Sequence, residues 1–71
     1  EKVLRARLPG VVRKLFISEG DIVEKGDVLL ILEAMKMEQQ VLAPCNGSIK
    51  NLNALEGDQV SENQPLLEVE G

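Results

Sequence analysis

One lysine in an unusual setting is the residue of this 71-residue chain best suited to chemistry. It is Lys36, in the segment Ala34-Met35-Lys36-Met37. A lysine amine can act as a nucleophile and can be acylated by a modifying enzyme. The chain has no histidine and a single cysteine, Cys45, which removes Cys-His and Ser-His-Asp pairs and the usual zinc ligand sets. We therefore expect no catalytic residue and no metal site, and Lys36 is the candidate functional residue.

The composition excludes several other classes of function. The net charge is −4, no Lys/Arg cluster is present and Phe16 is the one aromatic residue, so we expect no nucleic-acid partner. The longest apolar run, Val28–Leu32, is far too short to span a membrane. No secretory signal is visible and no internal disulfide is possible, which favours an intracellular location, either cytoplasm or mitochondrial matrix. We expect residues 1–71 to be one domain excised from a larger subunit, because the chain begins at Glu1 without an initiator Met.

The sequence repeats itself after a shift of 37 residues. Residues 10–34 and 47–71 align without a gap. Nine of the 25 aligned pairs are identical: Gly10/Gly47, Leu15/Leu52, Glu19/Glu56, Gly20/Gly57, Asp21/Asp58, Val23/Val60, Leu29/Leu66, Leu30/Leu67 and Glu33/Glu70. Two copies are too few for a solenoid. We therefore expect two halves related by approximate two-fold symmetry, each burying the hydrophobic face of the other.

The local patterns are typical of strands and turns. Apolar and β-branched residues are dense, and no segment has a 3.6-residue period over ten positions. Val28–Leu32 fits a strand buried on both faces or in a tight barrel wall. Turns are expected at 19–21, 25–27 and 56–58, where Gly allows positive φ and Asp can bond the backbone two residues on. The prediction is an all-β flattened barrel or sandwich with strands near 2–7, 10–17, 28–33, 37–42, 47–54 and 65–70, and short bridges near 22–24 and 59–61.

The segment between the two copies predicts a tight hairpin. A strand ending at Ala34 must reverse into one starting at Met37, which leaves only Met35 and Lys36 for the turn. Two-residue hairpin turns usually contain Asn-Gly or Gly-Gly, and residues with a Cβ cost about 1–2 kcal/mol each there. A local rule broken at one place often marks function. We expect Lys36 to project from a rigid tip, flanked by the adaptable apolar side chains of the two methionines.

These features together resemble the biotinyl domains of the biotin carboxyl carrier family. The resemblance rests on the EAMKM stretch from Glu33 to Met37, on both EGD turns and on the segments Leu8-Pro9-Gly10 and Ala43-Pro44, so it covers nearly the whole chain. Many members have Met where this chain has Leu8, a swap that conserves apolar volume. The resemblance implies a flattened barrel of two four-stranded antiparallel sheets.

The resemblance also implies a function. Biotin would be attached through an amide to Lys36 by a biotin protein ligase, with Ala34, Met35 and Met37 as recognition residues. The biotin would carry a carboxyl group from a biotin carboxylase to a carboxyltransferase domain or subunit of a biotin-dependent acyl-CoA or pyruvate carboxylase. The two halves align without a gap, which leaves no room for the protruding thumb of some bacterial acetyl-CoA carboxylase carriers.

Three alternatives remain open. A lysine on a hairpin tip is most often a solvated charge, and the domain would then be an unmodified interaction module. A lipoyl carrier has the same fold and hinge lysine, but generally has Asp directly before the lysine, where this chain has Met35. An enzyme that uses Lys36 as a Schiff-base nucleophile would need a desolvating pocket, which a hairpin tip does not offer.

Overall fold

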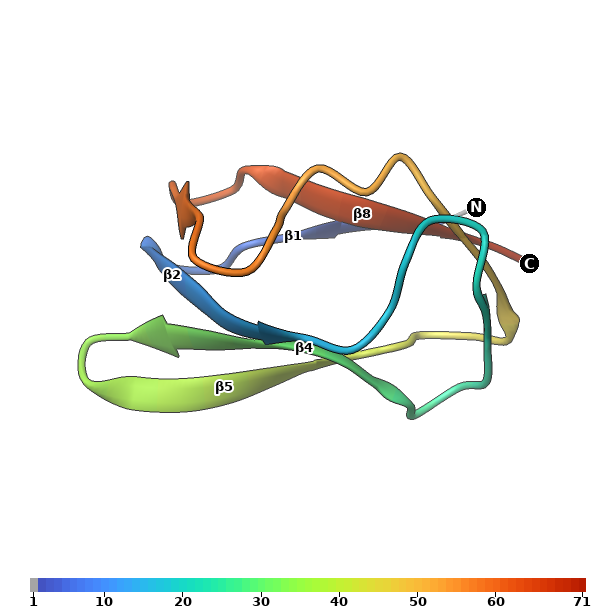
Figure 1. The fold of residues 1–71 in the computed structure, drawn as a ribbon, viewed down its shortest axis with the longest axis horizontal. Coiled ribbons are helices and arrows are strands. Elements are labelled where there is room, and N and C mark those ends of the chain that lie inside the picture. Colours follow the sequence, from blue (N-terminus) through green and yellow to red (C-terminus); the bar gives the residue numbers. More distant parts are fainter. Residues whose placement is uncertain (1) are drawn as a thin grey trace.

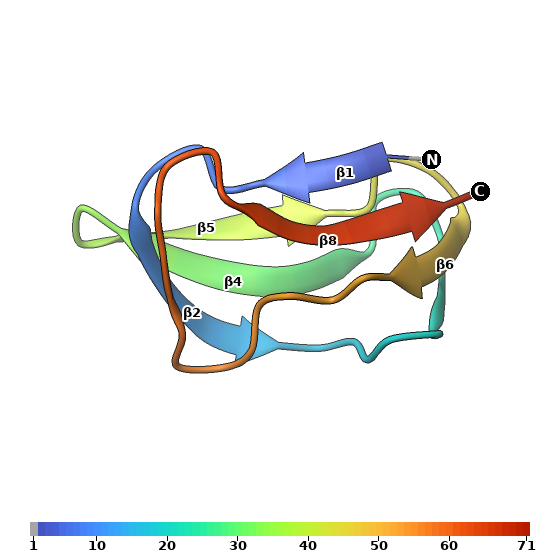
Figure 2. The same ribbon diagram turned by 90° about the horizontal axis from the view of Figure 1, so that it is seen from above.

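The computed structural model describes residues 2–71, and within this range the chain forms eight strands and no helix. The strands are β1 (Lys2–Arg5), β2 (Gly10–Leu15), β3 (Ile22–Val23), β4 (Val28–Ala34), β5 (Met37–Leu42), β6 (Gly47–Lys50), β7 (Gln59–Val60) and β8 (Pro65–Glu70). They form two four-stranded antiparallel sheets, which Figures 1 and 2 show as two layers. The prediction of a flattened all-β sandwich is confirmed.

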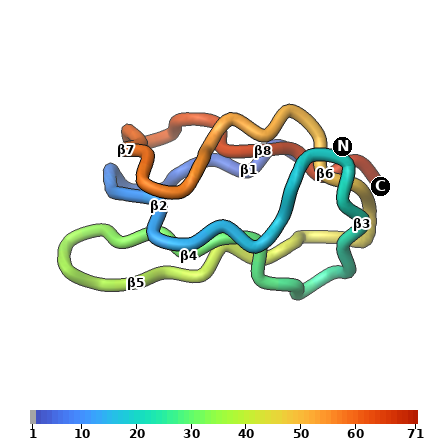
Figure 3. Tube along the Cα trace, viewed as in Figure 1, coloured from blue at the N-terminus to red at the C-terminus, as the bar shows by residue number. Residues whose placement is uncertain are grey.

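Each sheet contains strands from both halves of the repeat. One sheet has the order β1-β8-β6-β3 and the other β5-β4-β2-β7. The short strand β3 therefore pairs with β6 of the second half, and β7 pairs with β2 of the first. The tube in Figure 3 shows how the chain crosses between the layers to make these exchanges. Because each half completes the sheet of the other, neither half can fold into this structure alone.

The repeated EGD segment joins the two halves through the carboxylate of its glutamate. The Glu19 carboxylate accepts a hydrogen bond from the Leu52 N–H at 3.2 Å, and Glu56 accepts one from the Leu15 N–H at 3.3 Å. These contacts cross from one half to the other, so the identity of the repeated Glu reflects tertiary structure as well as turn chemistry.

The rest of the EGD segment forms the expected turns. Gly20 and Gly57 have φ values of 91° and 92°. The Gly20 N–H donates to the Ile49 carbonyl and the Gly57 N–H to the Val12 carbonyl, both at 2.8 Å. The Asp side chains differ from the prediction in direction. Asp21 accepts from the N–H of Ser18, three residues earlier, because the turn folds back toward the preceding segment.

The core lies between the two sheets and repeats the internal symmetry. The repeated Leu-Leu pair is buried in both copies, together with Val12 and its equivalent Ile49. The most deeply buried side chains are Leu29, Leu30, Ile49, Leu66, Leu67, Val12 and Val69. Cys45 packs against this cluster as a partly buried residue.

Three predicted strands are too long. The strand expected at 2–7 ends at Arg5, the one at 10–17 ends at Leu15, and the one at 47–54 ends at Lys50. The last ends because Asn51 adopts a φ of 49°, outside the extended region. The strand expected at 28–33 continues to Ala34, and those at 37–42 and 65–70 are confirmed.

Candidate functional site: the β4–β5 hairpin

The turn between β4 and β5 has the geometry that the sequence predicted. Ala34 pairs with Met37 across the hairpin, so the turn consists of Met35 and Lys36 alone. Their φ values are 53° and 66°. Positive φ at both central residues is the requirement of a type I′ turn, which matches the twist of the two strands. The chain therefore places two residues with a Cβ in a conformation that normally favours glycine or asparagine.

The tip of the hairpin stands free of the rest of the domain. Lys36 is exposed, and its side chain has no hydrogen bond or ion pair within residues 2–71. Met35 and Met37 are 78% and 65% exposed, although methionine usually packs in a core. The tip thus presents an exposed amine between two exposed apolar side chains.

The base of the hairpin is held by the start of β2. Ala34 is only 5% exposed, because the Gly10 backbone lies against it. A Cβ built on Gly10 would stand 3.2 Å from the Ala34 Cβ and would collide with the Glu33 carbonyl oxygen. A small residue at 34 and a glycine at 10 therefore let two strands meet closely just below the turn.

Charged side chains flank the base on the outer side of the sheet. Glu33 lies opposite Glu38 across β4 and β5, and like charges in that position repel. The Arg13 guanidinium forms an ion pair with Glu33 and offsets this repulsion. No local sequence pattern predicts this ion pair, because Arg13 and Glu33 are brought together by the pairing of β2 with β4.

The hairpin and the chain ends lie at opposite ends of an elongated molecule. The Cα trace measures 31 × 17 × 17 Å, and Figures 1 and 3 show the hairpin at one end of the long axis and both termini at the other. A domain held by its termini would present Lys36 at its far tip.

Lys36 stands exposed at the tip of the hairpin. An exposed tip does not desolvate an amine, which a Schiff-base lysine requires. Residues 2–71 hold no cluster of three or more His, Cys, Asp or Glu side chains suited to a metal ion. The same residues include no helix of the length and hydropathy needed to cross a membrane.

Comparison with solved structures agrees with this geometry. A single-chain, multi-domain long-chain acyl-CoA carboxylase contains a matching region with a TM-score of 0.83 and 35% identity, covering 92% of this chain and 7% of that one. The lipoyl domain of the 2-oxoglutarate dehydrogenase complex from Azotobacter vinelandii matches with a TM-score of 0.89 over 100% of this chain and 98% of its own. Its sequence identity is only 22%, so it shares the fold alone.

Comparison with characterised sequences is more specific. The chain is 42% identical over 65 residues to the alpha subunit of mitochondrial methylcrotonoyl-CoA carboxylase from Rattus norvegicus, and 43% identical over 67 residues to pyruvate carboxylase from Bacillus subtilis (strain 168). These alignments cover 92% and 94% of this chain but only 9% and 6% of the relatives. The family model described as "Biotin-requiring enzyme" matches residues 4–69. The chain therefore belongs to the biotin-requiring enzyme family, as a biotinyl carrier domain.

Proposed function

We propose that this chain carries biotin as an amide on Lys36 and serves as the carboxyl carrier of a larger biotin-dependent carboxylase. The observation that supports this most strongly is the hairpin itself. A two-residue turn holds one unpaired lysine at the far tip of the molecule, at a conformational cost that the fold does not need.

The residues present fit covalent biotin. A biotin protein ligase would bring biotinyl-adenylate, whose acyl carbon is attacked by Nζ of Lys36. The new C–N amide bond forms, the acyl–phosphate bond breaks, AMP leaves, and the amine loses its protons to the ligase or to water. Because Lys36 is exposed, the active site of the ligase can reach its amine. The exposed Met35 and Met37 side chains provide an apolar surface that the ligase can contact on either side of Lys36.

The carrier role follows from placement of the group. When attached, biotin takes up a carboxyl group on its ureido nitrogen at a biotin carboxylase site and releases it at a carboxyltransferase site. The chain's own contribution is to hold the attachment point on a stiff tip and to keep it near both sites through covalent linkage. We further propose that the domain is part of a larger acyl-CoA or pyruvate carboxylase subunit, located in the cytoplasm or the mitochondrial matrix. The chain acts on no substrate by itself.

Co-expression with a biotin protein ligase tests the proposal. The parent chain should gain the mass of one biotin and bind avidin, whereas Lys36→Arg should gain none although it keeps a long, positively charged side chain. Lys25→Arg is the matched control, because Lys25 is an exposed lysine on another turn of the same half and should leave the signal unchanged.

The same measurement separates the alternatives. A parent chain that stays unmodified with active ligase present would contradict the proposal and favour an interaction module. A lipoyl adduct, formed with a lipoyl ligase instead, has a different mass and does not bind avidin. Loss of the avidin signal in Lys25→Arg as well as in Lys36→Arg would show that the readout follows folding or another lysine.

A further inference from the structure

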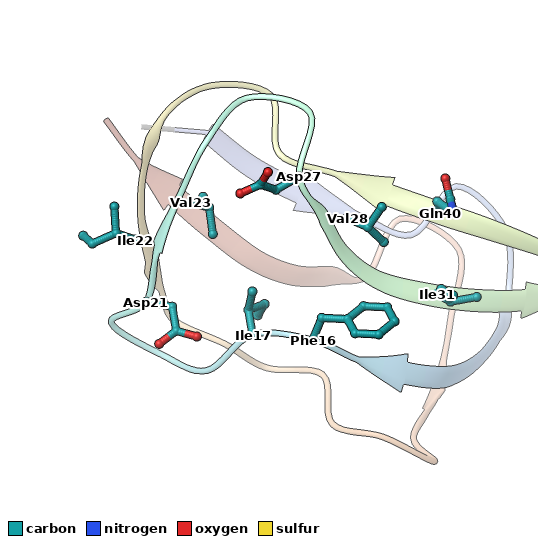
Figure 4. A pocket seen from close by; sticks show the side chains of 9 residues that line it. All are labelled: Phe16, Ile17, Asp21, Ile22, Val23, Asp27, Val28, Ile31 and Gln40. Atoms are coloured by element: carbon teal, nitrogen blue, oxygen red, sulfur yellow. The ribbon is translucent and has the colours of Figure 1, made fainter.

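Apolar side chains that are not buried gather where the end of β4 away from the hairpin meets β3, a strand of the other sheet. Phe16 is 55% exposed and Ile22 is 80% exposed, and they adjoin the half-buried Val28 and Ile31. These four residues, here called the apolar patch, line one open depression at the end of β4 away from the hairpin (Figure 4). Of the two alternatives expected for Val28–Leu32, burial on both faces is wrong, because Val28 and Ile31 are only half-buried and one face of β4 meets the core, which leaves the wall of the flattened barrel.

The second half of the molecule provides an internal comparison for the apolar patch. The equivalents of Phe16, Ile22, Val28 and Ile31 after the 37-residue shift are Asn53, Gln59, Pro65 and Glu68. One backbone hydrogen bond recurs in both places: the Phe16 N–H donates to the Leu29 carbonyl at 3.0 Å, and the Asn53 N–H donates to the Leu66 carbonyl at 2.8 Å.

The comparison shows that the fold does not require apolar side chains at these positions. The equivalent positions of the second half carry exposed polar residues at two of the four, Asn53 and Gln59. Exposed apolar residues that cluster on one face, rather than scattering, mark an interaction site. The apolar patch is therefore chemically distinct from its symmetry equivalent.

The rim of the depression is acidic. Asp21 and Asp27 line it beside the apolar patch, as Figure 4 shows. Oδ2 of Asp21 accepts a hydrogen bond from the Ser18 N–H, and Oδ2 of Asp27 accepts one from the Glu24 N–H, both at 2.9 Å. A carboxylate accepts several hydrogen bonds. Within the described residues the Oδ1 atoms have no partner, so the rim can receive a cationic side chain.

From this arrangement, and resting on the proposed carrier function, we infer that the apolar patch docks the carrier onto another domain of its own carboxylase. The segment of that domain that contacts the apolar patch has an apolar side chain next to a Lys or Arg. The Lys or Arg forms an ion pair with Asp21 or Asp27. The relatives support this partner, since the matching region is only 6–9% of their length and the remainder stays tethered nearby.

The position of the apolar patch suits a carrier. Val28 begins β4 and Ala34 ends it, so the β4 part of the apolar patch lies about 20 Å from the hairpin at roughly 3.3 Å per residue. A partner held at the apolar patch therefore leaves Lys36 free to enter an active site. Four residues make a small contact, typical of weak and reversible association, which a carrier that visits two sites needs.

The test uses the full carboxylase that contains this domain. The double variant Phe16→Asn with Ile22→Gln gives the first half the residues of the second half. The matched control is Asn53→Ser with Gln59→Ser, at the equivalent exposed positions. Biotin content and thermal midpoint are measured for each, together with carboxylation turnover and crosslinks from a photoreactive residue at position 22 or 59.

We expect the double variant to be fully biotinylated and folded but to turn over roughly fivefold or more slowly, since loss of buried apolar anchors dominates such contacts. The control should match the parent. Crosslinks should form from position 22 and not from 59, to a segment of another domain with Lys or Arg beside an apolar residue. If the double variant fails to fold, Ile22→Gln alone is the readout, because a side chain 80% exposed contributes little to folding.

Unchanged turnover in the folded double variant would overturn the inference, and so would an equal loss in the control or crosslinks only to a second copy of this chain. None of these results would affect biotin attachment to Lys36. Conversely, a parent carboxylase without biotin on Lys36 would refute the proposed function itself.

Discussion

Gly10 lies so close to Ala34 that a Cβ added to the glycine would stand 3.2 Å from the alanine Cβ. The same added Cβ would collide with the Glu33 carbonyl oxygen. The same relationship recurs between Gly47 and the Glu70 carbonyl, because the two halves repeat after 37 residues. The first contact lies directly below the β4–β5 hairpin. Comparing substitutions at Gly10 and Gly47 therefore distinguishes an effect on folding from an effect on the lysine-bearing turn.

Gly10→Ala and Gly47→Ala are both expected to destabilise the domain by about 1–3 kcal/mol, since backbone must move to admit the methyl group. Urea unfolding measures the loss. Under conditions where both variants are folded, only Gly10→Ala should slow ligase-catalysed biotinylation, because it displaces the base of the hairpin. Equal modification rates for the two variants would show that the contact with Ala34 does not position the turn.

Met35→Gly is expected to raise the free energy of unfolding by roughly 0.5–1 kcal/mol, because it removes the cost of a Cβ at a φ of 53°. The same change should slow biotinylation by removing an exposed apolar contact for the ligase. Asn63→Gly is the control, since Asn63 has a φ of 69° but asparagine tolerates that region, so stability should change by less than about 0.5 kcal/mol. Destabilisation by Met35→Gly would contradict the interpretation of the turn as strained.

The Arg13–Glu33 ion pair is expected to contribute less than about 1 kcal/mol, because both side chains are substantially exposed, 55% and 35%. A double-mutant cycle with Arg13→Gln and Glu33→Gln measures the coupling, which should fall as salt is added. The equivalent positions Lys50 and Glu70, between which the described structure has no ion pair, should show no coupling. A coupling above 2 kcal/mol would mean that the pair is far less solvated than its exposure indicates.

Leu29→Ala and Leu66→Ala are expected to cost about 2–5 kcal/mol each, because both side chains are fully buried at equivalent places in the core. Such a loss can unfold a domain of this size. Leu55→Ala is the exposed control, at 57% exposure, and should change stability by less than about 0.5 kcal/mol. Unfolding monitored by circular dichroism reports all three, and a mild effect at only one of the buried leucines would show that the halves are not equivalent in energy.

Much of this protein follows from its sequence alone. The repeat of 10–34 in 47–71, the glycine turns and the two residues left between Ala34 and Met37 are local features, so they predicted the internal symmetry, the β-strands and the hairpin. Local backbone preferences are sufficient for such elements, because a two-residue turn constrains its own φ angles.

The tertiary structure decided the features that depend on distant residues. The exchange of β3 and β7 between halves, the contact of Gly10 with Ala34 and the pairing of Arg13 with Glu33 all join residues separated along the chain. The outward face of β4 was decided there too, since apolar periodicity does not tell a strand buried on both faces from one buried on a single face. The physical reason is the same in each case: burial and sheet pairing are properties of the packed layers and not of any segment by itself.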